Sequence, residues 1–311
     1  MTFKKILCPI DFSPGSQQAM GVAVRLATAS NAELVLAHAW YLPPLAYGGE
    51  YPVAPEAVQI LVDDEKRGLE DAARDAAALG ARRVETRLLS GVPWQQLVEL
   101  LRADTGFDLV VMGTHGRTGL SRFLLGSVTE NVVRQAPCPV LVVRSQGAGT
   151  FGHVLCPVDF SACSREAVEL AAAVAAPGGA GITLLHVIEL PVSYSGEPPV
   201  AGFAEDLDRA SARLLDQWSR ELATKVSVPV ATRSRIGSPG AQILAVLESD
   251  PTFDLVVMGS HGRTGVRRML LGSVAEKVVR HAACPVLVTH SRQAAAEHRA
   301  PEAGAGVVTQ R

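Results

Sequence analysis

The chain contains the same sequence twice. Residues 6–13 read ILCPIDFS and residues 154–161 read VLCPVDFS. Residues 107–143 and 253–289 are identical at 28 of 37 aligned positions. The matching segments occur in the same order, at separations of 148 and 146 residues. Because a copy of about 145 residues can form its own hydrophobic core, the repeat indicates a duplicated domain rather than a solenoid of small units.

The duplication predicts a first domain at residues 1–145 and a second at 151–290. Between them, residues 145–152 read SQGAGTFG, a composition typical of flexible connectors. The connector contains a G-x-G-x-x-G pattern, but a strand pattern follows it where a dinucleotide site requires a helix, so we assign it no binding role. Residues 291–311 have weak periodicity and are rich in Ala, Gly and charge, which predicts a disordered tail.

Within each copy, short apolar runs alternate with helical patterns. In the first copy the predicted strands are 4–10, 32–40, 83–91, 108–113 and 139–143, and the predicted helices are 14–30, 55–80, 92–104 and 126–135. Aromatic residues make up only 5% of the chain, so aliphatic side chains must fill the cores, as in parallel sheets buried on both faces. Strand–helix alternation implies parallel pairing through right-handed crossovers. The sequence therefore predicts an α/β fold of two doubly wound domains, each a five-stranded parallel sheet flanked by helices.

A carboxylate follows the first predicted strand of each copy, as Asp11 and Asp159. Acidic residues at such strand ends accept hydrogen bonds from ribose hydroxyls in dinucleotide folds. Asp11 could equally cap the helix that begins near Pro14, for which Ser13 is also a candidate N-cap. The local sequence leaves both interpretations open.

A glycine pattern, G-x2-G-x9-G-S, follows the fourth predicted strand of each copy. Its members are Gly113, Gly116, Gly126 and Ser127 in the first copy, and Gly259, Gly262, Gly272 and Ser273 in the second. Glycine permits positive φ and close approach of the backbone to a ligand. Successive N–H groups and the start of a helix both attract phosphate. Ser127 and Ser273 are expected to donate to phosphate or to cap the helix, and the two roles are compatible.

These residues and motifs resemble the universal stress protein family, in its ATP-binding branch and tandem form, over residues 3–290. The resemblance implies the strand order 3-2-1-4-5 and dimerisation through the last strand. With two copies on one chain, Val140–Val143 is expected to pair with Val286–Thr289, because each is an apolar edge that needs cover. A homodimer of the whole chain is left open.

The resemblance also implies a nucleotide site in each copy. Asp11 and Asp159 would hold ribose, while Pro9 and Pro157 would line the pocket. Ala39 and Val187 would contact adenine, and Met112 and Met258 would lie against the base or ribose. The phosphates would be held by Gly113, Gly116, Gly126, Ser127 and Val128, and in the second copy by Gly259, Gly262, Gly272, Ser273 and Val274. Since Ala39 is smaller than Val187, tighter binding is expected in the second copy.

The function expected from this resemblance is that of a stress-response regulator that binds ATP or a related adenine nucleotide, with Mg²⁺ as an open addition. The alternatives are a slow ATPase or phosphotransfer enzyme, and an interaction module that needs no nucleotide. No residue is clearly placed to stabilise a transition state, so no catalytic residue is assigned and enzymatic activity stays open. Regulatory protein partners are expected but not identified.

Net charge, cysteine content and the remaining histidines and arginines bear on the expected partners, the compartment and the residues outside the nucleotide site. A net charge of −2 and the absence of a long apolar run predict neither nucleic-acid nor membrane binding. Five scattered cysteines favour the cytoplasm, and no residues have metal-ligand spacing. His38 and His186 are interpreted as buried structural residues, and His115 and His261 as solvated loop residues rather than phosphate donors. Arg117 and Arg263 are phosphate clamps or solvated, and Cys138 and Cys284 receive no role.

Overall fold

The computed structural model describes residues 3–41, 54–114, 125–144, 151–175, 181–190, 203–262 and 271–290. Its strands are β1 (Lys5–Pro9), β2 (Glu33–Trp40), β3 (Val84–Ser90), β4 (Leu109–Gly113), β5 (Val140–Val143), β6 (His153–Val158), β7 (Gly181–Ile188), β8 (Val230–Ile236), β9 (Leu255–Gly259) and β10 (Val286–Thr289). Its helices are α1 (Pro14–Ser30), α3 (Pro55–Ala78), α4 (Pro93–Ala103), α5 (Ser127–Gln135), α6 (Ala162–Ala175), α7 (Phe203–Ala223), α8 (Pro239–Ser249) and α9 (Ser273–His281).

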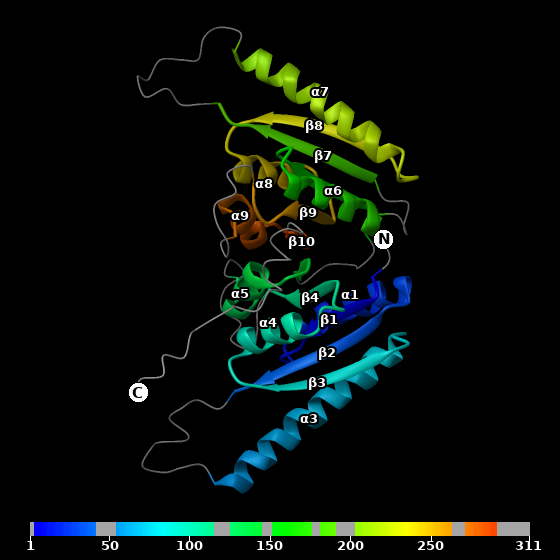
Figure 1. Cartoon of the computed structure of the whole chain (residues 1–311), viewed down its shortest axis with the longest axis vertical. Helices are drawn as coiled ribbons and strands as arrows, with labels where there is room; N and C mark the ends of the chain where they lie inside the picture. The colour runs from blue at the N-terminus through cyan, green and yellow to red at the C-terminus, as the bar shows by residue number, and fades with distance from the viewer. Residues whose placement is uncertain are drawn as a thin grey trace, which may run out of the picture.

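The described strands form one ten-stranded sheet that runs through both halves of the chain (Figure 1). Its order is β3-β2-β1-β4-β5-β10-β9-β6-β7-β8, so each half has the predicted order 3-2-1-4-5. Strands pair in parallel within a half, whereas β5 and β10 pair antiparallel, with Leu141 opposite Leu287. The expected pairing of the two last strands is therefore confirmed, and it joins the halves into a single sheet.

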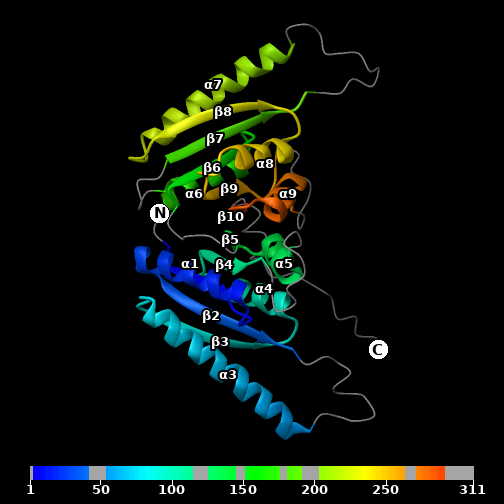
Figure 2. The same ribbon diagram turned by 180° about the vertical axis from the view of Figure 1, so that it is seen from behind.

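Two hydrophobic cores lie on opposite faces of this sheet, and each core includes residues of both halves. One core contains the inward faces of α1, α3, α6 and α7, and the other contains those of α4, α5, α8 and α9. Figure 2 shows the longer helices α3 and α7 at the two far ends of the sheet. The central strands β4, β5, β9 and β10 are buried on both faces, which explains their Val and Leu runs, whereas the outer strands β3 and β8 are partly exposed.

Local signals for helix ends behave as the sequence predicts. Ser13 caps α1, because its Oγ accepts a hydrogen bond from the Ser16 N–H at 3.2 Å, and Pro14 follows at the first helical position. Asn31 ends α1 in the left-handed region, with φ of 53°. Gly80 follows α3 with φ of 110°, a conformation that glycine adopts without strain.

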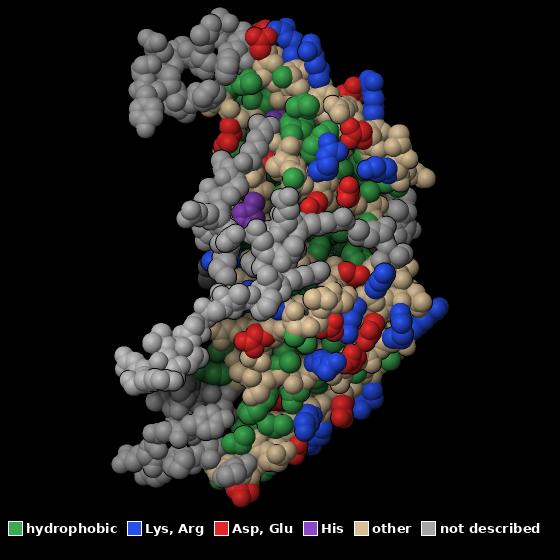
Figure 3. Space-filling model, in the orientation of Figure 1, with side chains coloured by type: hydrophobic (Ala, Val, Ile, Leu, Met, Phe, Trp, Pro, Cys, Tyr) green, Lys and Arg blue, Asp and Glu red, His purple; other side chains and the backbone are tan. Residues whose placement is uncertain are grey.

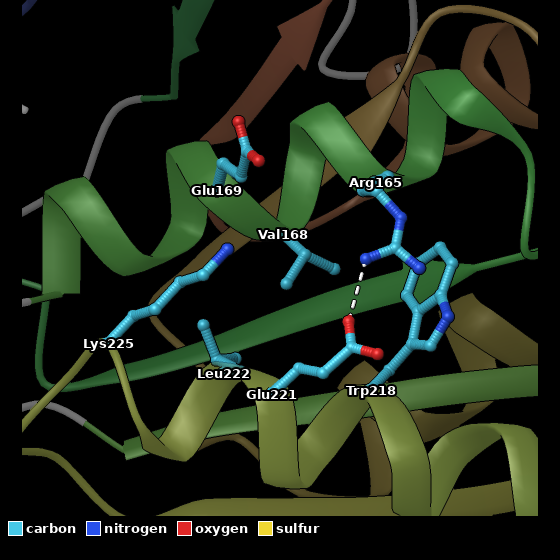
Figure 4. Close-up of a pocket in the computed structure, with 7 residues that line it drawn as sticks. All are labelled: Arg165, Val168, Glu169, Trp218, Glu221, Leu222 and Lys225. Atoms are coloured by element: carbon cyan, nitrogen blue, oxygen red, sulfur yellow. Dashed lines mark hydrogen bonds and ion pairs between the residues drawn. The ribbon is translucent and has the colours of Figure 1, made fainter.

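In the second half, aromatic and charged side chains connect the outer helix α7 to α6. Trp218 is buried against the ring of Phe160, and the Arg165 guanidinium lies 4.3 Å from the centre of the Trp218 ring (Figure 4). Arg165 also donates to Glu221 at 2.8 Å, and this hydrogen bond lowers the pKa of the Glu221 carboxyl. The hollow beside these side chains has a volume of about 20 Å³, which suits a water molecule rather than a ligand.

Charged side chains of both signs are interspersed along the face shown in Figure 3. Among the described residues, several charged side chains form ion pairs one helical turn apart, such as Arg220 with Asp216 at 2.7 Å. Mixed charge on this face agrees with the near balance of acidic and basic residues in the whole chain. In the part of the chain that the structure describes, no helix is both long and apolar enough to cross a bilayer.

Candidate functional site

A cavity of about 660 Å³ opens at the carboxyl ends of the strands in the second half. Its volume is in the range of small-molecule sites, and its position is where open α/β sheets bind ligands. Every residue predicted for the second-copy site lines it: Pro157, Asp159, Val187, Met258, Gly259, Gly262, Gly272, Ser273 and Val274. Residues that are far apart in the sequence therefore meet around one cavity, because β7, β6 and β9 are neighbours in the sheet.

Asp159 is held rigidly at this cavity. Its Oδ1 accepts hydrogen bonds from the Ser161 N–H at 3.0 Å and the Ser161 hydroxyl at 2.6 Å. Asp11 binds Ser13 in the same way, at 3.1 and 2.6 Å. The interpretation of Asp11 as the direct cap of α1 is therefore wrong, because Ser13 is the cap and Asp11 orients it. This arrangement fixes the carboxylate of each half at the strand end.

The residue after each of these aspartates has a strained backbone. Phe12 has φ of 63° and Phe160 has φ of 64°, in the left-handed region that a bulky L-residue enters at a cost of about 1–2 kcal/mol. Strain of this kind concentrates at binding and catalytic sites, where the surroundings hold it in place. Its presence in both halves supports a functional role for the turn after the first strand.

The site glycines are required by close contacts and not by positive φ. Among the described residues, positive-φ glycines are Gly80, Gly91 and Gly237, all outside the site, so of the two properties that glycine permits only close approach applies to the described members of the pattern. A Cβ atom on Gly262 would lie 2.8 Å from Asp159 Oδ2, and one on Gly272 would lie 3.0 Å from the Ser260 carbonyl oxygen. Side chains at these positions would push the loop away from the carboxylate and from α9.

The helices that begin at the Gly-Ser pairs start at residues without a side chain. Gly126 and Gly272 are the N-cap residues of α5 and α9, with extended backbone, and among the described residues no side-chain cap hydrogen bond is present at either helix. Ser127 and Ser273 are the first helical residues, so the alternative that they are N-caps is wrong. In the second half, Gly272, Ser273 and Val274 line the cavity. The first turn of α9 thus presents an anion-attracting helix end to the cavity.

His261 also lines the cavity, in the loop that precedes α9. Its Nδ1 lies 2.8 Å from the Ser260 hydroxyl, and its Nε2 is buried without a hydrogen-bond partner among the described residues. The interpretation of His261 as a solvated loop residue is therefore wrong, since a solvated ring would expose this nitrogen. The remaining loop candidates, His115, Gly116, Arg117 and Arg263, lie outside the described residues.

The first half brings its predicted residues to equivalent places. Pro9 ends β1, Met112 and Gly113 end β4, and Ala39 lies near the end of β2. Because β2, β1 and β4 are adjacent, these residues share one edge of the sheet with Asp11. Gly126, Ser127 and Val128 begin α5 at the same edge, and the Gly126 N–H donates to the Thr114 carbonyl at 2.8 Å.

The two halves differ in the helix that follows the second strand, which is α3 in the first half and α7 in the second, where it forms one side of the cavity. His38 and His186 are both buried, as predicted, and their Nδ1 atoms contact the carbonyls of Ile10 and Val158 at 2.6 and 2.7 Å. In the first half, His38 Nε2 also lies 3.1 Å from a carboxylate oxygen of Glu65. The equivalent of Glu65 is Ser211, which lines the second-half cavity. A carboxylate therefore stands in the first half where the second half has a hydroxyl.

Sequence reasoning missed this helical wall. The α7 residues that line the cavity are Leu207, Ala210, Ser211 and Leu214, and α8 adds Pro239 and Ile243. The spacing of the α7 residues, at i, i+3, i+4 and i+7, marks one face of a helix and could have found them. Periodicity alone, however, does not distinguish a face that packs in a core from one that lines a cavity.

The charges around the cavity limit the chemistry that it can perform. Its described lining includes the carboxylates Asp159 and Glu189 but neither Lys nor Arg. Positive potential comes instead from the start of α9 and its backbone N–H groups. Within the described residues, no group of three or more His, Cys, Asp or Glu side chains is arranged to hold a metal ion. The described arrangement suits binding of an anion by backbone groups.

The cysteines are expected to be unreactive in the folded chain. Burial raises the pKa of the Cys8 thiol to about 12 and that of the Cys284 thiol to about 11. Because the thiolate is the reactive form, Cys8 and Cys284 should react negligibly with Ellman's reagent at about pH 8, and burial keeps Cys138, Cys156 and Cys163 from the reagent. The absorbance of the released chromophore measures this, and the urea-unfolded chain, in which all five cysteines should react, is the control.

The same shifts predict a pH dependence of stability. A thiol pKa that is raised by folding contributes stability that is fully present below its ordinary value, near 9, and lost as the pH rises through about 11. The free energy of unfolding should therefore fall over this range.

In the Ellman experiment, rapid, stoichiometric reaction of a native thiol at neutral pH would contradict the assignment of these cysteines to the core.

Comparison with known proteins places this architecture in a family. Residues 2–144 and 150–290 each match the model of the universal stress protein family. The chain belongs to that family. Universal stress protein Rv2005c of Mycobacterium tuberculosis is 31% identical over 262 residues, which cover 79% of this chain and 81% of that protein. A universal stress protein of Mycolicibacterium smegmatis is 29% identical over 301 residues, covering 92% and 97%.

A solved universal stress protein from Archaeoglobus fulgidus shares the fold. It superposes with a TM-score of 0.70 and 23% identity, and the match covers 94% of this chain and 100% of that one. At that identity the likeness shows the fold alone. The chain is accordingly a tandem universal stress protein whose two copies share one continuous sheet.

Proposed function

We propose that each half of this tandem universal stress protein binds one adenine nucleotide, with ATP as the ligand, and that binding regulates the protein's interactions in a stress response. The observation that carries the proposal is the convergence of all nine second-copy site residues on one cavity. These residues come from two segments around β6 and β7 and two around β9 and α9. A purely structural role for the glycine loops gives no reason for this convergence.

The chemistry of the cavity fits the parts of a nucleotide. Val187 and Met258 at the strand ends, with Ile243 of α8, offer apolar surface for the base. Asp159, whose Oδ1 is fixed by Ser161, offers a carboxylate for ribose hydroxyls. The uncapped start of α9 offers N–H groups for the phosphates. The equivalent residues of the first half support the same assignment there.

Binding is favoured over fast phosphoryl transfer. Enzymes that transfer a phosphoryl group stabilise the charge of the transition state with Arg, Lys or metal ions. The described lining contains no such side chain, and its charged members are carboxylates. We therefore propose a regulator in which nucleotide binding changes the surface offered to partner proteins.

Titration calorimetry with ATP and with GTP tests this proposal. We expect about two ATP molecules per chain, weaker binding of GTP, and a rise in the midpoint of thermal unfolding as ATP is added. Native mass spectrometry of gently purified protein should show co-purified adenine nucleotide. Absence of heat and of any thermal shift at millimolar ATP would overturn the proposal, and equal affinity for GTP would overturn the choice of adenine.

A further inference from the structure

Arg144 connects the first half to the helix at the second-half site. It follows β5, and its guanidinium donates to the Val279 carbonyl at 2.8 Å and to the Arg280 carbonyl. Both carbonyls belong to the last turn of α9, where the helix itself supplies no N–H donor to the carbonyl oxygens. A cation of one half therefore caps the helix whose first turn lines the cavity of the other half.

His290 makes the reciprocal connection from the second half. It follows β10, is buried, and its Nε2 lies 2.9 Å from the Val133 carbonyl in the last turn of α5. Arg144 and His290 are equivalent positions, 146 residues apart, and so are the accepting residues Val133 and Val279. Each half thus donates one side chain to the helix of the other half across the β5–β10 pair. The first half uses Arg144 and the second half uses His290.

The C-terminal turn of α5 or α9 affects its N-terminal turn because these helices are short. Each has nine residues, or a length of about 13 Å. Helices of this length are marginal alone and depend on contacts at both ends. A donor at the C-terminus fixes where the first turn lies, and a cation there complements the same macrodipole that attracts an anion to the N-terminus.

We propose that Arg144 is a positioning residue for nucleotide at the second-half site and that His290 is a positioning residue for the first-half site. Each site is then incomplete without the opposite half. This inference rests on the proposed function and deepens it, because it gives the fused pair a purpose beyond burying two strand edges. It also predicts that the two halves depend on each other for ligand affinity.

The test measures ATP affinity in the full chain, one site at a time. Asp11→Ala disables the first-half site, so that only the second-half site binds ATP. Asp159→Ala disables the second-half site, so that only the first-half site binds ATP. In the Asp11→Ala background we expect Arg144→Ala to raise the Kd for ATP about threefold to tenfold and His290→Ala to change it less than twofold. In the Asp159→Ala background the two effects should exchange. Arg144→Lys should restore most of the affinity, since it keeps a charged donor.

The crossed pattern separates positioning from general stability. Equal weakening of both sites by either substitution, weakening of the site in the same half, or no change would overturn the inference while leaving nucleotide binding intact. Failure of the wild-type chain to bind ATP at all would overturn the proposed function and this inference together. If Arg144→Ala does not fold, as judged by circular dichroism, Arg144→Gln, which removes the charge, gives the same comparison, with Arg144→Lys as its charged control.

Discussion

Replacing Asp159 by alanine is expected to remove one of the two ATP molecules bound per chain. The Asp159 carboxylate lines the cavity, and its Oδ1 is fixed by two hydrogen bonds from Ser161. A hydrogen bond to a charged acceptor is worth about 1.5–3 kcal/mol, so the loss of two ribose contacts should weaken binding about 100-fold or more. Titration calorimetry should report a stoichiometry that falls from about two to about one.

The first half supplies the matched control for this variant. Asp11→Ala should likewise leave one site, and the double variant should bind no ATP. Ser161→Ala tests the indirect route, since it frees the carboxylate without removing it and should weaken binding far less. If Asp159→Ala still bound two ATP molecules with unchanged affinity, the carboxylate would have no part in the site.

Replacing Gly113 by alanine is expected to destabilise the chain by about 3 kcal/mol. A Cβ atom on Gly113 would lie 2.8 Å from the carbonyl oxygen and 2.9 Å from the carbonyl carbon of Gly15. Both are backbone atoms in the first turn of α1, so the helix must move away from β4, and overpacking of this kind typically costs about 1–3 kcal/mol or more. Urea unfolding followed by circular dichroism measures the effect.

Substitutions at two further glycines serve as controls for this prediction. At the equivalent Gly259 the nearest atom is the Cys163 sulfur, at 2.8 Å, so Gly259→Ala should cost less, and Cys163→Ala should relieve part of that cost. Gly21 lies in α1 with only the end of Arg25 within 4 Å, and Gly21→Ala should stabilise by about 0.5–1 kcal/mol. A Gly113→Ala chain as stable as the wild type would show that the close approach of α1 to β4 is not tight.

Much of the fold follows from the sequence because its signals are local and repeated. The alternation of apolar runs with helical patterns predicts the strands, and the duplication predicts that Val140–Val143 meets Val286–Thr289, as the antiparallel pair confirms. The Ser13–Pro14 helix start is also confirmed. Each of these features depends on neighbouring residues or on symmetry between the copies.

The parts of the site that depend on tertiary packing were harder to predict. Glycine at 113 and 259 permits either positive φ or close approach, and the structure shows that the reason is the approach of α1 and α6 to the strand ends, which no local pattern encodes. The replacement of Glu65 by Ser211 could be read from the sequence only once the opposing His38 and His186 were known to face those helices. The crossed contacts of Arg144 and His290 likewise appear only when the halves are joined.

A crystal structure of the full chain grown with excess ATP tests the central claim most directly. The account predicts adenine beside Val187, ribose on Asp159 and phosphates at the first turn of α9, with the equivalent arrangement at Asp11 and α5. Empty strand ends in both halves, or ATP bound elsewhere on the chain, would contradict it.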